Sequence, residues 1–166
     1  MMKKLLLLIV LFIGAYLQGS AQEIFNTILH DAQAVVDDST SSVVSAKIAQ
    51  FKVDALKYIR TKAFEKQDEV SKVFLDNQAY YMKQFLNTFF SGVVTNSELS
   101  KGQKKDLILF FMDASQSNPL YNDPDRELVD AYVHNSKTQF TPFCLDTDWT
   151  KAYAAVQSRL KAAAQQ

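Results

Sequence analysis

The stretch from residue 70 to residue 94 constrains the fold of this chain more than any other part. Its apolar residues recur at steps of four or seven and then broaden around the helix, leaving only a narrow polar stripe. They are Val70, Val73, Phe74, Tyr81, Met82, Phe85, Leu86, Phe89, Phe90 and Val93. A helix that is apolar over most of its circumference must be covered on several sides. We therefore predict that residues 70–94 form the central helix of an all-α bundle.

Length and composition agree with a single helical domain. The chain has 166 residues, which fits one domain, and only 4 Gly and 3 Pro, which disfavours a turn-rich β-protein. Lys plus Arg is 18 and Asp plus Glu is 18, so the formal net charge is zero. A neutral chain lacks the basic surface that phosphate binding requires, so we expect no nucleic acid among its partners.

The N-terminal 21 residues have the pattern of a cleaved export signal. Lys3 and Lys4 precede an apolar run over residues 5–17, and small residues follow, ending at Ala21. The run is shorter than the roughly 20 residues that cross a bilayer, so we expect no stable membrane anchor after cleavage. Cleavage after Ala21 would make Gln22 the first residue of a single domain, residues 22–166, located in the periplasm or outside the cell.

Two short segments resemble sequence patterns of Bacteroidota. Residues 19–22 resemble the signal-peptide ends common in that group, and residues 38–40 resemble its short O-glycosylation motif. The second resemblance implies Ser39 as the modified residue, in a polar linker between two predicted helices.

We predict about six helices in the bundle. Besides the central helix they span residues 23–36, 43 to about 61, 106 to about 115, 124 to about 134, and 148 to about 163. Residues 65–69 contain no apolar side chain, so we expect a bend or loop before the central helix. The second helix carries a heptad-like apolar series, Val44, Ile48, Phe51 and Ala55. The apolar run at 107–112 has the length of a strand, but no other segment offers a partner strand.

Two acidic clusters contain the candidate metal ligands. They consist of Asp123, Asp125 and Glu127, and of Asp146 and Asp148. Carboxylate oxygens of this kind can hold Ca²⁺, but the spacing is not that of an EF-hand loop. Both clusters also open predicted helices, where aspartate accepts from free backbone N–H groups. We favour helix caps, with Asp123 capping one helix and Asp146 or Thr147 the last, and keep a Ca²⁺ site as the alternative.

The single cysteine, Cys144, cannot form an internal disulfide. Its apolar neighbours favour a small buried side chain. The alternatives are an intermolecular disulfide or a nucleophile assisted by His30 or His134.

The aromatic residues have two interpretations. Helical spacing favours a core, but the adjacent pairs Tyr80–Tyr81 and Phe89–Phe90 must each point in two directions, which could leave an exposed strip for a partner. A carrier of a small apolar ligand would instead show a cavity lined by Phe85, Phe89, Phe110 and Phe111.

No motif in the sequence assigns an enzymatic activity. The patterns GxSxG, HExxH, GxGxxG and the P-loop do not occur. We therefore expect a non-enzymatic binding or structural protein of the bacterial cell envelope, with an unidentified protein or envelope partner or as a homo-oligomer. The alternatives are a metal-dependent enzyme or metal-stabilised protein, and the apolar-ligand carrier.

Overall fold

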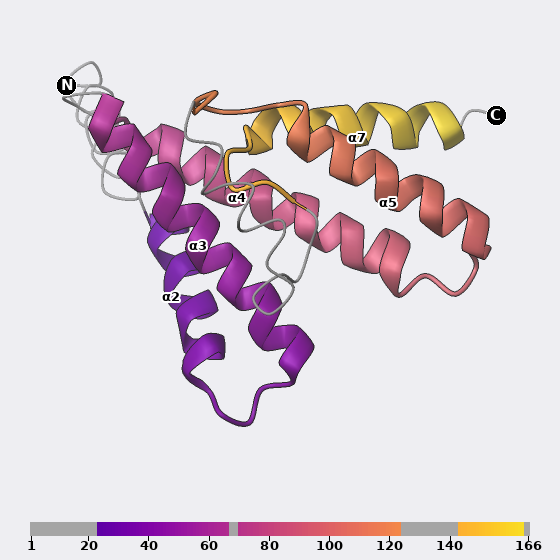
Figure 1. The fold of residues 1–166 in the computed structure, drawn as a ribbon, viewed down its shortest axis with the longest axis horizontal. Coiled ribbons are helices and arrows are strands. Elements are labelled where there is room, and N and C mark those ends of the chain that lie inside the picture. The colour runs from indigo at the N-terminus through magenta and orange to yellow at the C-terminus, as the bar shows by residue number, and fades with distance from the viewer. Residues whose placement is uncertain (1–22, 67–69, 124–142, 165–166) are drawn as a thin grey trace, which may run out of the picture.

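The structure is a computed structural model in which residues 23–66, 70–123 and 143–164 are described. These residues form α2 (Glu23–Asp37), α3 (Val43–Lys66), α4 (Lys72–Phe89), the π-helical turn η1 (Phe90–Val94), α5 (Lys101–Gln116) and α7 (Trp149–Ala164) (Figure 1). No strand occurs within these ranges, which confirms the predicted all-α class.

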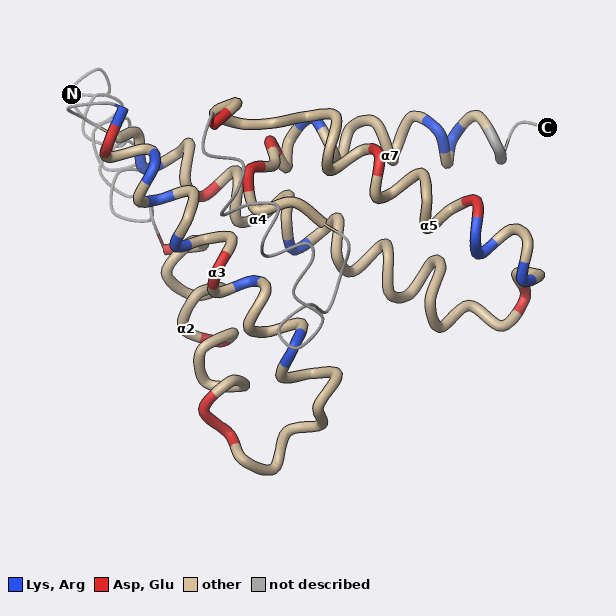
Figure 2. Tube along the Cα trace, viewed as in Figure 1, with Lys and Arg blue, Asp and Glu red and all other residues tan. Residues whose placement is uncertain are grey.

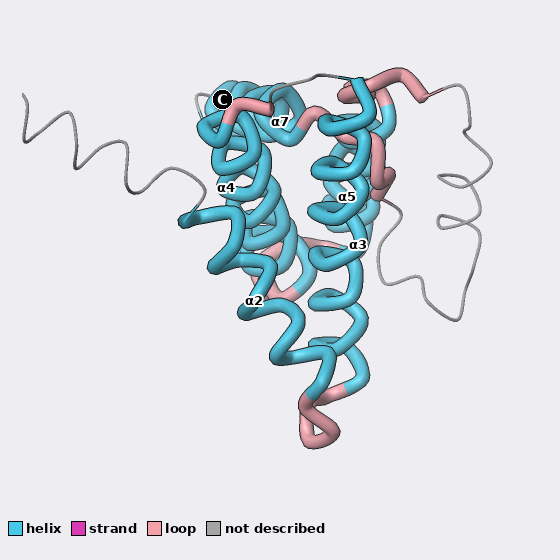
Figure 3. Tube along the Cα trace, turned by 90° about the vertical axis from the view of Figure 1, so that its left-hand side faces the viewer, coloured by secondary structure: helices cyan, strands magenta, loops and turns pink. Residues whose placement is uncertain are grey.

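Helix α4 is the centre of the described fold, as the sequence predicts. It contacts α2, α3 and α7, while α5 contacts α7 and η1. Helices α2 and α3 run antiparallel to each other (Figure 1), and in the turned view α2 and α4 lie on one side of the molecule with α3 and α5 on the other (Figure 3). Two apolar residues of α4 face solvent instead, since Val73 is 59% and Tyr80 43% exposed.

Aromatic rings join the two sides of the molecule. The ring of Phe85 on α4 lies 5.1 Å from those of Phe111 and Phe143 and 5.3 Å from Trp149, each in an edge-on arrangement. Trp149 also meets Phe51 of α3 at 6.0 Å. All five side chains are fully buried. Edge-to-face packing is a favoured geometry for aromatic pairs, so this cluster contributes more than its buried area alone.

The boundaries of α3 and α4 follow the local sequence. Helix α3 extends through Glu65 to Lys66, so the first two residues of the predicted break at 65–69 are helical, and residues 67–69 lie outside the described ranges; residues 70 and 71 are not helical, and α4 begins at Lys72. Val44, predicted as the first residue of the heptad-like series, is 59% exposed, so that part of the prediction is wrong. Ile48 is half-buried, and Phe51 and Ala55 are fully buried, so the series packs inward only from its second residue onward.

Helix α5 begins at Lys101, five residues before the predicted start at residue 106. The Ser100 side chain accepts from the Gln103 backbone, and the Gln103 side chain accepts from the Ser100 backbone, which forms a capping box. This reciprocal cap starts the helix within a polar segment, ahead of its apolar residues.

Several predictions fall on residues outside the described ranges. They are the signal segment 1–21 with its cleavage point between Ala21 and Gln22, and the helix at residues 124–134. Within residues 23–66, 70–123 and 143–164, no helix combines the length and apolar character needed to cross a membrane. Among the described helices, α2 carries acidic residues and no Lys or Arg, α7 carries basic residues and no Asp or Glu, and α3, α4 and α5 carry both (Figure 2).

Candidate functional site

The Asp146 carboxylate fixes the loop that follows α5. Its Oδ1 accepts from the backbone N–H of Leu120 (3.1 Å) and Tyr121 (2.8 Å), and its Oδ2 accepts from that of Asp123 (3.1 Å). The side chain is only 5% exposed in a segment just before α7. Asp146 therefore joins two loops far apart in the sequence, and the prediction that it caps the last helix is wrong.

Asp148 is the residue that caps α7. Its Oδ1 accepts from the backbone of Lys151 (3.3 Å), from the hydroxyl of Thr150, and from the Gln78 side chain (3.2 Å). The same Gln78 accepts from the backbone of Trp149 (2.9 Å). Burial raises the pKa of Asp148, but the hydrogen bonds from Thr150, Lys151 and Gln78 together hold that pKa below its ordinary value. The buried amide of α4 thus fixes the start of α7.

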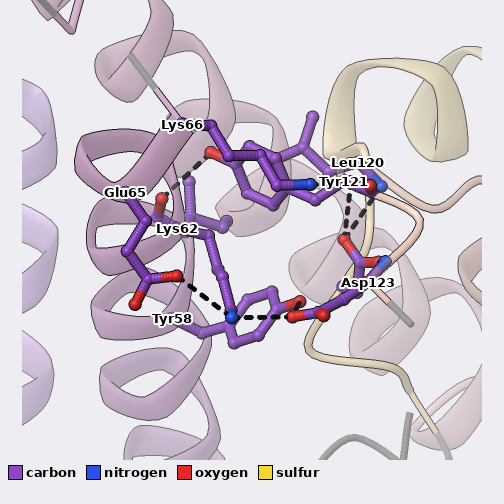
Figure 4. A network of polar contacts seen from close by, with 9 residues as sticks. Tyr58, Lys62, Glu65, Lys66, Leu120, Tyr121 and Asp123 are labelled. Atoms are coloured by element: carbon purple, nitrogen blue, oxygen red, sulfur yellow. Dashed lines mark hydrogen bonds and ion pairs between the residues drawn. The ribbon is translucent and has the colours of Figure 1, made fainter. Parts of the chain in front are cut away.

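The Asp123 carboxylate faces helix α3 (Figure 4). It accepts from the Tyr58 hydroxyl (3.2 Å) and lies 2.9 Å from the Lys62 ammonium, which also pairs with Glu65 at 3.1 Å. Burial, and then the charges of Asp146 and Asp123, raise the pKa of Tyr58. This network holds the loop after α5 against α3.

Asp123 and Asp146, one residue from each acidic cluster, lie close together in space. The Asp123 backbone lies 3.1 Å from Oδ2 of Asp146. Their carboxylate oxygens, however, are engaged by protein N–H, O–H and ammonium groups. Within the described part of the chain, no three His, Cys, Asp or Glu side chains are arranged to hold a metal ion. Asp125 and Glu127 lie outside the described residues.

Cys144 and Ser39 occupy opposite environments. Cys144 is 8% exposed, which confirms its predicted burial, and its backbone N–H donates to the Ser115 hydroxyl at 3.0 Å. Ser39 lies exposed in the turn between α2 and α3. The Asp38 carboxylate accepts from the Thr40 backbone beside it at 2.9 Å. Glycosylation of Ser39 stays a prediction.

The rings proposed for an apolar carrier pack against one another. Phe85, Phe89 and Phe111 are at most 5% exposed, with ring centroids 5.1 to 5.3 Å apart where they meet. Phe110 lies under the Arg159 guanidinium at 4.8 Å. The cavities described next are lined by other residues, beside α2.

A hollow between α2, α3 and α4 is the candidate binding site, and we call it the α2 pocket. Its volume is about 320 Å³, and nine residues line it: Ile28, Asp31, Ala32, Val35, Ser45, Ile48, Ala49, Lys52 and Lys83. Ala32 and Ala49 are 5% and 4% exposed, so the hollow forms where small side chains face each other across packed helices. The pocket is therefore part of the helical framework rather than a gap beneath a loop.

A cap supplied by α4 positions helix α2 over this hollow. The Asp76 carboxylate of α4 accepts from the Phe25 backbone N–H at 2.8 Å, in the first turn of α2. Phe25 is itself fully buried. The hydrogen bond from the Phe25 backbone and the burial of the Phe25 side chain thus fix the same end of α2.

A wider groove adjoins the α2 pocket, and we call it the α2–α4 groove. Its volume is about 670 Å³, and it shares Ile28 and Lys83 with the pocket. Exposed apolar side chains of both helices line it, with Ile24 44%, Val73 59% and Tyr80 43% exposed. Of the two aromatic pairs considered from the sequence, Tyr80 is exposed, Tyr81 and Phe90 are half-buried and Phe89 is buried, so the pairs do not form a continuous exposed strip.

Two lysines give the α2 pocket its electrostatic character. Within the described part of the chain, the side chains of Lys52 and Lys83 form no hydrogen bond and no ion pair. Burial lowers the pKa of Lys52, the positive charge of Lys83 lowers it further, and Asp31 offsets part of the effect. Two ammonium groups and one carboxylate leave a formal excess of one positive charge.

The sequence contains only a weak signal for this site. In α3, the charged residue Lys52 lies among the apolar residues that pack against the neighbouring helices. In α4, Val73 and Tyr80 are seven residues apart and therefore share one face of the helix. Neither pattern shows that helix α2 packs against both α3 and α4. No protein-family model, no curated protein and no solved structure matches this chain.

Proposed function

We propose that this chain is an exported protein of the bacterial cell envelope that binds a small ligand in the α2 pocket without catalysis. One observation carries the proposal. A cavity of about 320 Å³, walled by Ile28, Val35 and Ile48, is also lined by two lysine side chains that form no hydrogen bond or ion pair with the other described residues.

The dimensions and composition of the pocket support small-molecule binding. Small-molecule sites are mostly apolar clefts of about 300 to 1,000 Å³ with a few polar groups that orient the ligand. The α2 pocket lies at the lower end of that range. Its mixture of aliphatic walls and isolated charges matches the general pattern. A cavity required only for packing would gain nothing from one half-buried and one exposed lysine in its lining.

The export part of the proposal rests on the N-terminal sequence. We expect the full chain, expressed in a Gram-negative host, to accumulate in the periplasmic fraction. Its intact mass should correspond to a polypeptide that begins at Gln22. A cytoplasmic product that retains Lys3 and Lys4 would reject export and leave the binding proposal untouched.

Ligand binding can be tested with N-phenyl-1-naphthylamine, a neutral apolar dye that fluoresces when it leaves water. We expect saturable fluorescence with the purified protein. In Ser45→Trp the signal should be largely lost, because an indole at this exposed rim position would fill the pocket. Leu109→Trp is the matched control, since Leu109 is 50% exposed on α5 and lines neither the pocket nor the groove.

The two variants separate the possible outcomes. Loss of binding in Ser45→Trp with retention in Leu109→Trp supports the α2 pocket as the site. Equal binding by both variants, with unchanged melting temperatures, would show that the dye binds elsewhere and would reject the proposal.

A further inference from the structure

We propose that the ligand of the α2 pocket is a single-tailed organic carboxylate, whose charged group lies between Lys52 and Lys83. This inference rests on the proposed function and adds the chemical class of the ligand. It follows from how charge and apolar surface are distributed within the pocket.

Lys52 lies toward the end of the pocket that is farther from the turn between α2 and α3. Helices α2 and α3 are antiparallel and are joined by the turn at residues 38–42. Ser45 and Val35 line the pocket near that turn. Lys52 lies seven residues beyond Ser45, which is about 10 Å along the helix. A ligand with its anionic group at Lys52 would therefore extend its tail toward the turn, along Ile48 and Val35.

The second lysine comes from a different helix and faces the first. Lys83 of α4 is exposed, lines the same hollow, and lies close enough for its charge to lower the pKa of Lys52. Two like charges that approach each other without a shared counter-ion are mutually repulsive. An anion placed between them would remove that repulsion and accept hydrogen bonds from both ammonium groups. Asp31 offsets only one of the two positive charges.

The neighbouring groove explains why the anionic group belongs in the pocket. The α2–α4 groove also includes Lys83, but it adds the carboxylates of Glu23 and Asp76. The groove therefore has a formal excess of one negative charge, and the pocket has an excess of one positive charge. Ile28 lines both hollows, and an anion is favoured in the α2 pocket, on the side of Ile28 where Lys52 lies.

The apolar walls distinguish this ligand from a simple inorganic anion. Ile28, Ala32 and Ala49 are at least 93% buried, so they form a rigid aliphatic lining beside the charges. Inorganic phosphate would use the lysines and leave that lining in contact with water. Each methylene of a tail that covers it would strengthen binding about fourfold when fully buried.

The test compares three probes by isothermal titration calorimetry on the purified protein: octanoate, octan-1-ol and inorganic phosphate. We expect saturable binding of octanoate, with at least about tenfold weaker binding of both other probes. Lys52→Gln and Lys83→Gln should each weaken octanoate binding about tenfold, because each removes a charge-assisted contact. Binding of octan-1-ol should not change in either variant.

Lys57→Gln is the matched control on the same helix. Lys57 is exposed and lines neither hollow, so octanoate binding should not change in that variant. Equal affinity for octanoate and octan-1-ol would overturn the role of the lysines. Equal affinity for octanoate and phosphate would overturn the role of the tail.

The result can be separated from the proposed function by the dye assay. If the wild-type protein binds N-phenyl-1-naphthylamine in the pocket but does not bind octanoate, the carboxylate inference is wrong and the binding function stands. If Ser45→Trp also binds the dye as the wild type does, both fail.

Discussion

Replacing Asp146 tests whether this buried carboxylate holds two loops together or belongs to a metal site. In Asp146→Ala the backbone N–H groups of Leu120, Tyr121 and Asp123 lose the acceptor that lies 2.8 to 3.1 Å from them. Water can reach part of this loop, because Leu120 and Tyr121 are only half-buried. Asp123 is buried, so its N–H would stay without a partner.

The magnitude follows from these three contacts. A donor left unsatisfied costs about 1 to 3 kcal/mol, with the lower value where water can enter. Two losses near 1 kcal/mol and one near 2 give about 4 kcal/mol. Release of a buried charge offsets part of this, so we expect a net loss of about 3 kcal/mol. For a chain of this size that is a fall of about 10 °C in melting temperature.

Asp146→Asn should fall between the wild type and the alanine variant. Its amide oxygen can still accept from Leu120 and Tyr121, but its NH₂ group would face the N–H of Asp123. We expect a loss of about 2 kcal/mol. Asp113→Ala is the control, because the exposed carboxylate of Asp113 accepts only from the Ser117 hydroxyl among the described contacts, and its loss should stay within about 0.5 kcal/mol.

Urea denaturation, followed by far-ultraviolet circular dichroism, measures these differences, with and without EDTA. The reasoning predicts the same order of stabilities in both buffers. It would be refuted if Asp146→Ala lost less than about 1 kcal/mol. It would also be refuted if EDTA destabilised the wild type to the level of the variant, because the carboxylate would then be a metal ligand.

Three further perturbations test the packing around α4 and α7. Gln78→Leu removes the side chain that binds both the Trp149 backbone and Asp148, and should lower the free energy of unfolding by about 2 to 3 kcal/mol in urea denaturation. The folded-state pKa of Asp148 is depressed, so the contribution of this carboxylate to stability is present above about pH 4 and is lost as pH falls through the lowered pKa. The melting temperature of Asp148→Asn should therefore fall less on acidification than that of the wild type. Phe85→Ala opens a cavity in the aromatic cluster and should cost about 3 to 5 kcal/mol, and an unchanged denaturation midpoint would contradict the assignment of Phe85 to the core.

Local sequence patterns were sufficient to predict most of the helices. The apolar periodicity of residues 70–94 identified α4 and its central place, because a helix with so little polar surface must be enclosed. The polar segment at residues 65–69 predicted a break before it, and residues 70 and 71 are not helical. Val44 was misassigned because periodicity shows which residues share a face and not how far along the helix a neighbour extends.

The candidate site depended on contacts that no local pattern contains. Asp146 has the sequence context of a helix cap, but its acceptor oxygens meet a loop 23 to 26 residues earlier in the chain. Lys52 and Lys83 lie on different helices, and only the crossing of α2 brings them to one hollow. Such sites require the helix packing angles, which side-chain periodicity does not determine.

The contact between Asp76 and Phe25 also has a consequence for the order of folding. An isolated helix as short as α2 is marginal in water, and its cap is a residue 51 positions away. The Phe25 N–H therefore gains this acceptor only once α4 is in place, although all-helical chains usually fold through local contacts. We expect the amides at the start of α2 to become protected from hydrogen exchange later than those of α4 during refolding, and Asp76→Asn to lengthen that interval.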